Sequence, residues 1–151
     1  MAIDPAVIGS RTPEYSVQVE RGRLRSFALA TGQTDPVWSD LEAARAAGHR
    51  DLPVPPTFLF CLETENPDRG RFLADLGVDI RTVLHGGQAF GYHAQACAGD
   101  TLTFSTEVKD VYTKRGGALE FLVRATEVTR DGAPVATLTS TVVVRDPRAA
   151  A

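Results

Sequence analysis

The chain has 151 residues, 43% of them hydrophobic, and its 16 basic and 19 acidic side chains leave a formal net charge of −3. This length and apolar share suffice for one soluble domain whose core needs no disulfide or metal ion to hold it together. The slight acidic excess argues against nucleic acid as a partner, because phosphate backbones are bound by clustered Lys and Arg, and no apolar run approaches the roughly 20 residues that cross a membrane.

The first half of the chain has a helical and loop-like pattern. Tyr15–Val19 alternates briefly between apolar and polar residues and predicts a short edge strand. Arg23–Ala30 carries an apolar stripe near the helical period and predicts a helix. Ser39 followed three residues later by Glu42 forms a capping-box pattern, which predicts a second helix over Leu41–Ala47.

Three prolines between residues 53 and 56 exclude a helix at their own positions but favour one that begins directly after them. The apolar run Thr57–Leu62 that follows predicts a buried helix. A further short helix is expected to begin at Asp68 and to end at Gly77, since glycine is the usual residue just beyond a helix end.

From about Ile80 onward the sequence alternates with the period of two that strands have. The alternation is clearest over Thr101–Val108 and Leu119–Thr126, and Asp131-Gly132 predicts a hairpin turn into a further strand over Val135–Val144. Strands with one polar face predict an antiparallel sheet that packs on an apolar element, for which the helix after the prolines is suited. The pattern therefore predicts an α+β domain in which a curved antiparallel sheet wraps one buried helix.

The cysteines and the two ends of the chain bear on its environment. Cys61 and Cys97 stand far apart without C-x-x-C spacing, which is typical of buried thiols in a cytosolic protein. Residues Met1–Ser10 lack the basic and apolar regions of a signal peptide, so we expect a cytoplasmic protein. The Ala-rich end at 146–151 is expected to be frayed.

The chain carries none of the common nucleotide-binding, hydrolase or metalloprotease motifs. Its histidines, His49, His85 and His93, have no second His or Cys at ligand spacing, so we expect no metal site. His85 lies in Leu84-His-Gly-Gly-Gln88, and it is either hydrogen-bonded near a sheet bulge or acts as a general acid/base or substrate contact. His93 is expected at the surface, and His49 at a helix end in a structural role.

The segment Ala30–Asp40 holds the only tryptophan of the chain, Trp38, close to Asp35. Trp38 either clamps this loop to the core, with Asp35 as a turn residue, or belongs to a loop arranged over a ligand pocket. The residues of the segment leave both alternatives open.

The pattern becomes specific in three stretches that follow one another along the chain. They are Thr31–Asp40 together with Glu42–Gly48, then Pro53–Phe58, and finally Leu84–His93 leading to Ala98–Leu102. On these stretches the chain resembles the MaoC-like dehydratases, hot-dog-fold proteins of acyl-thioester metabolism, and most of all their FAS1-like or N-terminal-half branch. The likeness covers about residues 10–145 and implies one hot-dog domain over 1–151, with a long central helix.

The resemblance implies hydration of a trans-2-enoyl thioester to an (R)-3-hydroxyacyl thioester, or the reverse dehydration. Active members carry Asp-x-Asn-Pro-x-His on the loop between the two early helices. In this chain the Asp and His positions fall on Gln33 and Trp38, and Asp35 stands for the Asn. An amide cannot act as a carboxylate base and an indole has no accessible proton-transfer pKa, so the resemblance implies a thioester site without its acid/base pair.

The rest of the thioester site is implied by position. The backbone N–H that stabilises the enolate oxygen in the family falls near Thr57, at the start of the helix after the prolines. The other residues expected to contact the thioester are Pro56, Phe58, Gly86 and Gly87.

Four functions are left open, the least specific of which is a non-enzymatic sensor of acyl thioesters. Hot-dog dehydratases include heterodimers in which one subunit keeps the Asp/His pair and the other supplies binding surface for the acyl chain, and this chain resembles the second kind. It could instead be a self-sufficient enoyl-CoA hydratase in which Asp35 or His85 replaces the missing groups, or a hot-dog acyl-CoA thioesterase.

The same resemblance implies the partners. The expected ligand is an acyl-CoA or acyl carrier protein thioester, and no cofactor is expected. The expected assembly is a homodimer, or a heterodimer with a catalytic MaoC-like subunit, joined by a continuous sheet. The acidic net charge disfavours an acidic carrier protein, although Arg21, Arg23 and Arg25 could offset it.

Overall fold

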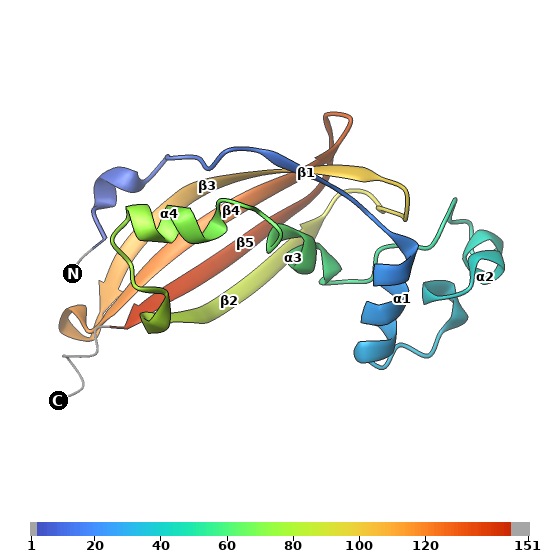
Figure 1. Ribbon diagram of the computed structural model, residues 1–151, viewed down its shortest axis with the longest axis horizontal. Helices are drawn as coiled ribbons and strands as arrows, with labels where there is room; N and C mark the ends of the chain where they lie inside the picture. Colours follow the sequence, from blue (N-terminus) through green and yellow to red (C-terminus); the bar gives the residue numbers. More distant parts are fainter. Residues whose placement is uncertain (1–2, 146–151) are drawn as a thin grey trace.

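The computed structural model describes residues 3–145, so the tail expected to fray at 146–151 lies outside the described residues. Within them, one antiparallel sheet has the strand order β1-β3-β4-β5-β2 (Figure 1). The strands are β1 (Tyr15–Gln18), β2 (Val83–Tyr92), β3 (Thr101–Lys114), β4 (Leu119–Arg130) and β5 (Ala133–Arg145). The α-helices are α1 (Arg21–Ala30), α2 (Leu41–Ala46), α3 (Phe58–Glu63) and α4 (Arg69–Asp75). Short 3₁₀ turns are η1 (Pro5–Val7), η2 (Pro36–Trp38), η3 (Ile80–Thr82) and η4 (Arg115–Gly117).

Strands β4 and β5 form the hairpin that the sequence predicts. Its two turn residues, Asp131 and Gly132, have φ angles of 51° and 79°, because a two-residue hairpin turn needs positive φ. Along the hairpin, Leu122 faces Val142, and both are buried on the same side of the sheet. The alternating pattern of the sequence therefore corresponds to one covered and one open face.

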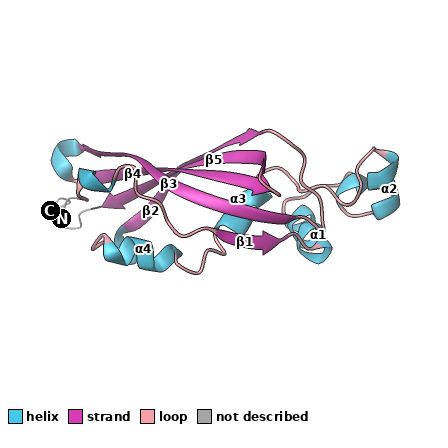
Figure 2. Cartoon of the chain, turned by 90° about the horizontal axis from the view of Figure 1, so that it is seen from above, coloured by secondary structure: helices cyan, strands magenta, loops and turns pink. Residues whose placement is uncertain are grey.

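Helix α3 lies against the covered face, which we call the inner face. Its buried Phe58, Leu59 and Leu62 belong to one apolar cluster with Phe104 of β3 and Leu138 of β5. Figures 1 and 2 show α3 and α4 on this side of the sheet, and α1 and α2 beyond its end. The predicted α+β arrangement, a helix packed on an antiparallel sheet, is confirmed.

The central helix is shorter than the long helix that the resemblance implied. Helix α3 has six residues, and the chain turns before it continues as α4. Pro67 explains the interruption, because it has no N–H to donate and restricts the residue before it to extended backbone. The side chain of Asn66 holds the turn by accepting the N–H of Asp68 at 2.8 Å.

The predicted cap of α2 is wrong by one residue. Asp40, and not Ser39, caps the helix, since its Oδ1 accepts the N–H of Ala43 at 2.7 Å. Ser39 closes the preceding turn instead, with its N–H bonded to Pro36 at 3.0 Å. Asp and Ser serve equally well as N-caps, so the choice is made by where the turn ends.

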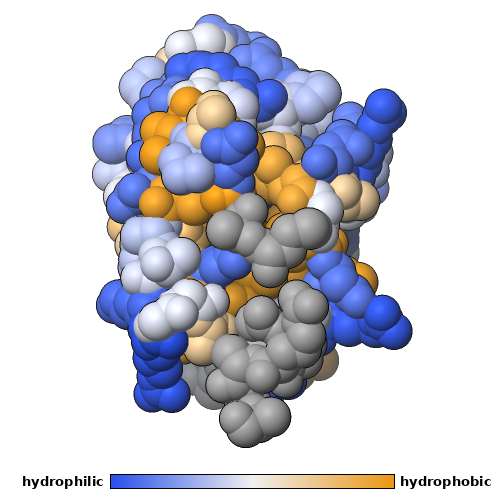
Figure 3. Space-filling model, turned by 90° about the vertical axis from the view of Figure 1, so that its left-hand side faces the viewer, coloured by the Kyte–Doolittle hydropathy of each residue, from blue (hydrophilic) through white to orange (hydrophobic). Residues whose placement is uncertain are grey.

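A second apolar cluster occupies the opposite end of the sheet from α1 and α2. It includes Leu73 of α4, Val108 of β3 and Leu122 of β4. Figure 3 views this end and shows hydrophobic surface between hydrophilic side chains.

In the described part of the chain, no helix has the length and apolar character needed to cross a membrane.

Candidate functional site

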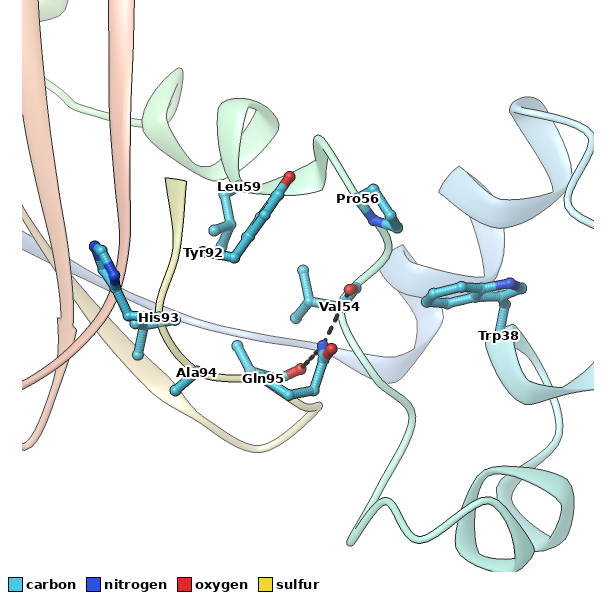
Figure 4. A pocket seen from close by; sticks show the side chains of 10 residues that line it. Trp38, Val54, Pro56, Leu59, Tyr92, His93, Ala94 and Gln95 are labelled. Carbon is cyan, nitrogen blue, oxygen red and sulfur yellow. Dashed lines mark hydrogen bonds between the residues drawn. The ribbon is translucent and has the colours of Figure 1, made fainter. Parts of the chain in front are cut away.

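A cavity of about 400 Å³ lies where the start of α3, the turn η2 and the end of β2 come together (Figure 4). Its apolar lining residues are Trp38, Val54, Pro56, Leu59, Ala94, Ala96 and Val135. Its polar lining residues are Tyr92, His93 and Gln95. A cavity of this size is within the range of small-molecule sites.

The proline-rich segment before α3 forms one wall of the cavity. Residues 52–54 run antiparallel to 96–98, with the N–H of Val54 bonded to Ala96 at 2.8 Å. Prolines suit such an extended segment because they fix φ and need no partner for an N–H. The chain then enters α3 directly beside the cavity. The prolines correctly predicted where this helix begins.

Thr57 joins this wall to α3 in an unusual conformation. Its φ angle is 70°, in the left-handed region that favours glycine. Its backbone N–H donates to the hydroxyl of Tyr92 at 3.0 Å. The ring of Tyr92 stacks in parallel on Phe90, with 5.9 Å between the ring centroids, and so holds the hydroxyl in place. The N–H expected to contact a thioester oxygen therefore lies beside the cavity, already bonded to a cavity residue.

In the loop between α1 and α2, the positions of the family's Asp and His have different surroundings. Trp38 lines the cavity, whereas Gln33 is exposed in the turn after α1, where its N–H bonds to Ala28 at 2.9 Å. Asp35 starts η2 by accepting the N–H of Val37 at 2.9 Å, so its carboxylate acts as a turn residue. Both alternatives for this segment hold in part: Asp35 shapes the turn and Trp38 faces a pocket.

Each of the three polar side chains in the cavity lining makes at least one hydrogen bond within the protein. The amide of Gln95 donates to the carbonyls of Val54 and Ala96, at 3.2 and 2.8 Å. Nε2 of His93 lies 3.0 Å from the hydroxyl of Thr137, and the hydroxyl of Tyr92 accepts from Thr57. The cavity therefore offers a ligand mainly carbon surface, which suits an apolar group.

Of the remaining predicted residues, only Pro56 lies in the cavity lining. His85 packs edge-on against Phe60 at 5.2 Å, and it is seven residues before Tyr92 on the same strand, or about 23 Å along it. Gly86 and Gly87 lie at the bulge beside His85. Pro56 does line the cavity, but Phe58 points into the core, where its ring meets the edge of Phe27 at 5.0 Å.

A buried carboxylate fixes the loop that carries Gln95. Asp100, whose side chain is 3% exposed, accepts the N–H of Cys97 at 2.9 Å and pairs with Arg130 at 2.8 Å and with Arg50. Arg130 also donates to the carbonyl of Gln95 at 3.2 Å. This network holds one wall of the cavity rigid through contacts that lie outside it.

The three arginines at the start of α1 are already engaged. Arg21 donates two hydrogen bonds to Asp51, at 2.8 and 2.5 Å. Arg23 pairs with Glu65, and Arg25 donates to the carbonyl of Ser39 at 2.8 Å. The hydrogen bond from Arg21 lowers the pKa of Asp51 to about 2. These contacts reduce the basic surface that α1 could offer an acidic carrier protein.

No group of three or more His, Cys, Asp or Glu in the described residues could hold a metal ion. Cys61 and Cys97 are both free, and burial raises the pKa of the Cys61 thiol. The cavity accordingly contains no described group arranged to coordinate a metal or to act as a nucleophile.

Tyr92 and Gln95 are two of the cavity residues that the sequence did not point to. The alternation along β2 contained a signal for Tyr92, because residues 88, 90 and 92 face the same side of a strand. Gln95 had no such signal, since its role depends on the two carbonyls that its amide binds.

The comparisons with known proteins agree with the fold. The sequence matches the family model of the FAS1-like, dehydratase domain region over residues 6–138. A UPF0336 protein of Clavibacter michiganensis subsp. michiganensis is 40% identical over 146 residues, which cover 96% of this chain and 97% of that protein.

Two solved structures are also similar. The C-terminally truncated HadBC (3R-hydroxyacyl-ACP dehydratase) complex of Mycobacterium tuberculosis matches with a TM-score of 0.77 and 26% identity, over 91% of this chain and 96% of that chain. A MaoC-like dehydratase matches with a TM-score of 0.81 and 25% identity, over 95% of this chain and 43% of that chain. These likenesses confirm the MaoC-like hot-dog fold.

Proposed function

This chain belongs to the family of the FAS1-like dehydratase domain region, and from that premise we propose that it is an acyl-thioester-binding subunit without its own acid/base pair. The reaction it serves is the hydration of an enoyl thioester to an (R)-3-hydroxyacyl thioester, or the reverse dehydration. The acid and base come from a MaoC-like partner chain that carries the Asp/His pair.

The apolar cavity beside Trp38, at one of the two positions of the missing pair, carries this proposal. Trp38 lines it where the family's histidine would be, and Gln33 takes the place of the aspartate. The remaining polar lining groups are held by Thr57, Thr137 and two backbone carbonyls. Such a wall can bind an acyl group and exclude water, but it lacks the carboxylate–histidine pair with which active members of the family move the proton.

A division of labour between two chains follows. The partner activates the water and moves the proton at C2, while this chain holds the acyl group against Leu59, Val54 and Val135 and keeps bulk water away from it. The HadBC structure, to which this chain is similar, is itself a complex of dehydratase subunits, and this supports an assembly of two hot-dog chains.

The carrier and the location belong to the same proposal. CoA is favoured over an acidic acyl carrier protein, because the chain has a net charge of −3 and the arginines of α1 are paired within the protein. The two free cysteines support a location in the cytoplasm, where thiols stay reduced.

The test compares the chain alone with a variant that restores the pair. We expect the purified chain to leave crotonyl-CoA unhydrated, as followed by the loss of enoyl-thioester absorbance. The double variant Gln33→Asp with Trp38→His should raise the rate by a factor of about 10²–10⁴, the usual contribution of general acid/base catalysis.

The matched control is Gln33→Asp with Trp38→Phe, which supplies the carboxylate but no imidazole and should stay inactive. Rapid turnover by the unmodified chain would overturn the proposal. Release of free CoA without water addition would indicate a thioesterase instead.

A further inference from the structure

The hydroxyl of Tyr92 occupies the place at which a thioester oxygen would meet the backbone. It accepts the N–H of Thr57 at 3.0 Å, and that N–H has only one hydrogen to give. Figure 4 shows the ring of Tyr92 beside Leu59 and Pro56, with its hydroxyl toward the start of α3. A ligand oxygen that enters the cavity therefore meets the hydroxyl before it can reach the N–H.

This hydroxyl still has a hydrogen of its own to donate. A tyrosine hydroxyl can both donate and accept, and the bond from Thr57 uses only its acceptor side. No group among the described residues accepts the O–H of Tyr92, whose side chain is half-exposed in the cavity lining. An O–H becomes a stronger donor when its oxygen already accepts a hydrogen bond, so the contact with Thr57 prepares it to bind an acceptor.

The other two polar side chains of the lining are less suited to this contact. Gln95 donates its amide to two backbone carbonyls, at 3.2 and 2.8 Å. His93 is bonded through Nε2 to a threonine hydroxyl, and in Figure 4 its ring points away from the hydroxyl of Tyr92. Tyr92 is therefore the donor that faces a ligand at the start of α3.

The ring of Tyr92 is held in one orientation. It stacks on Phe90 with the two ring planes 1° from parallel, while the N–H of Thr57 fixes the hydroxyl at the other end of the side chain. A donor that is held before the ligand arrives loses little conformational freedom on binding, so more of its hydrogen-bond energy contributes to affinity.

We propose that the hydroxyl of Tyr92 is the hydrogen-bond donor for the thioester carbonyl oxygen, in place of the backbone N–H of Thr57. The carbonyl oxygen accepts the O–H at about 2.8 Å, the usual length of such a bond. The N–H binds the hydroxyl and the hydroxyl binds the ligand, so the cavity selects acyl groups that carry a carbonyl beside the sulfur. Tyr92 is a binding residue in this arrangement, and no proton is transferred.

This inference rests on the proposed function and names the group that recognises the thioester. The acyl chain can bind to the apolar lining without this contact, so the two proposals can fail separately.

Isothermal titration calorimetry of the full chain measures the contribution of the carbonyl. The ligands are butyryl-CoA and S-butyl-CoA, which has a methylene group in place of the carbonyl and is otherwise the same. We expect the unmodified protein to bind butyryl-CoA about two- to tenfold more tightly, the usual net effect of one hydrogen bond. Tyr92→Phe keeps the ring and should bind both ligands as the unmodified protein binds S-butyl-CoA.

A second variant separates donation by the hydroxyl from its occupation of the N–H. In Tyr92→difluorotyrosine the hydroxyl ionises near neutral pH, and the resulting phenolate can accept from Thr57 but cannot donate. The preference of this variant for butyryl-CoA should disappear as the pH rises and the hydroxyl ionises. The unmodified protein, which has the same His93, should keep its preference over the same pH range.

The matched control is Tyr112→Phe, which removes a hydroxyl from a ring that stacks on Phe121 outside the cavity and should keep the preference. Equal binding of the two ligands by the unmodified protein would overturn the inference and leave acyl binding by the cavity in place. A preference that survives both changes at Tyr92 would also overturn it. If neither ligand binds, the proposed function fails together with the inference.

Discussion

Thr57 shows how the backbone at one residue shapes the site. Its positive φ turns the chain from the proline segment into α3 and directs its N–H to the hydroxyl of Tyr92. A side chain with a Cβ is disfavoured in this conformation, so the position carries strain that a glycine would not. The cost is tolerated where the backbone forms the wall of a cavity.

The variant Thr57→Gly should therefore stabilise the protein. We expect the free energy of unfolding in urea to rise by about 1 kcal/mol, because the strain is relieved while the backbone hydrogen bond remains. Thr64→Gly is the control, since Thr64 has an ordinary φ of −73° and its hydroxyl donates to Cys61 at 2.7 Å. That variant should lose stability, by about 1 kcal/mol. A loss of stability in both variants would contradict backbone strain at Thr57.

At the scale of single elements, two adjacent glycines at the bulge in β2 have different surroundings. A Cβ added to Gly86 would lie 2.5 Å from a methyl carbon of Val143 and 3.2 Å from the carbonyl oxygen of Thr141. A Cβ added to Gly87 would meet nothing within 4 Å. Gly86 therefore lies closely against the neighbouring strand β5, and Gly87 does not.

Gly86→Ala and Gly87→Ala should accordingly differ in their effect on folding. The first overpacks the contact between β2 and β5 and should cost about 1–3 kcal/mol. The second should change the free energy of unfolding by less than about 0.5 kcal/mol. Urea denaturation of the two variants measures the difference directly, and equal losses would contradict it.

The helices show which elements could be predicted from the sequence. The prolines located the start of α3 because they act through local sterics. The apolar run Thr57–Leu62 also predicted the length of α3, which spans Phe58–Glu63, whereas the long helix implied by the resemblance is wrong because Pro67 interrupts it. The cap of α2 was missed by one residue because two good capping residues, Ser39 and Asp40, are adjacent.

The candidate site was only partly predictable. The absence of an acid/base pair at positions 33 and 38 could be seen in the sequence. The bond from Thr57 to Tyr92 and the buried pairing of Asp100 with Arg130 could not, because each joins residues at least 30 positions apart that only the fold brings together.

On the scale of the whole molecule, ionic contacts fasten the α1–α2 region to the rest. Arg21 of α1 holds Asp51, and Arg50, next to it, holds Asp100 at the start of β3. The hydrogen bond from Arg21 lowers the pKa of Asp51 from 3.8 to about 2. Since the folded state binds the proton more weakly than the unfolded chain, this contact stabilises the fold above pH 3.8.

The stability from this contact should be lost as the pH falls from about 4 to about 2. We expect Asp51→Asn to flatten that part of the stability profile, measured by thermal unfolding at a series of pH values. Asp79, whose pKa is also lowered to about 2 by a hydrogen bond from Arg81, is the control. Its partner is two residues away, a contact that the unfolded chain can keep, so Asp79→Asn should change the profile less.

Trp38 also gives the protein a built-in optical signal. It is the only tryptophan in the chain, and it lines the cavity proposed for the acyl group. Its fluorescence therefore reports one place in the molecule, with no label and no competing indole. An apolar ligand that displaces water from beside this ring should shift and intensify its emission, so that filling of the cavity can be titrated separately from any chemistry that follows.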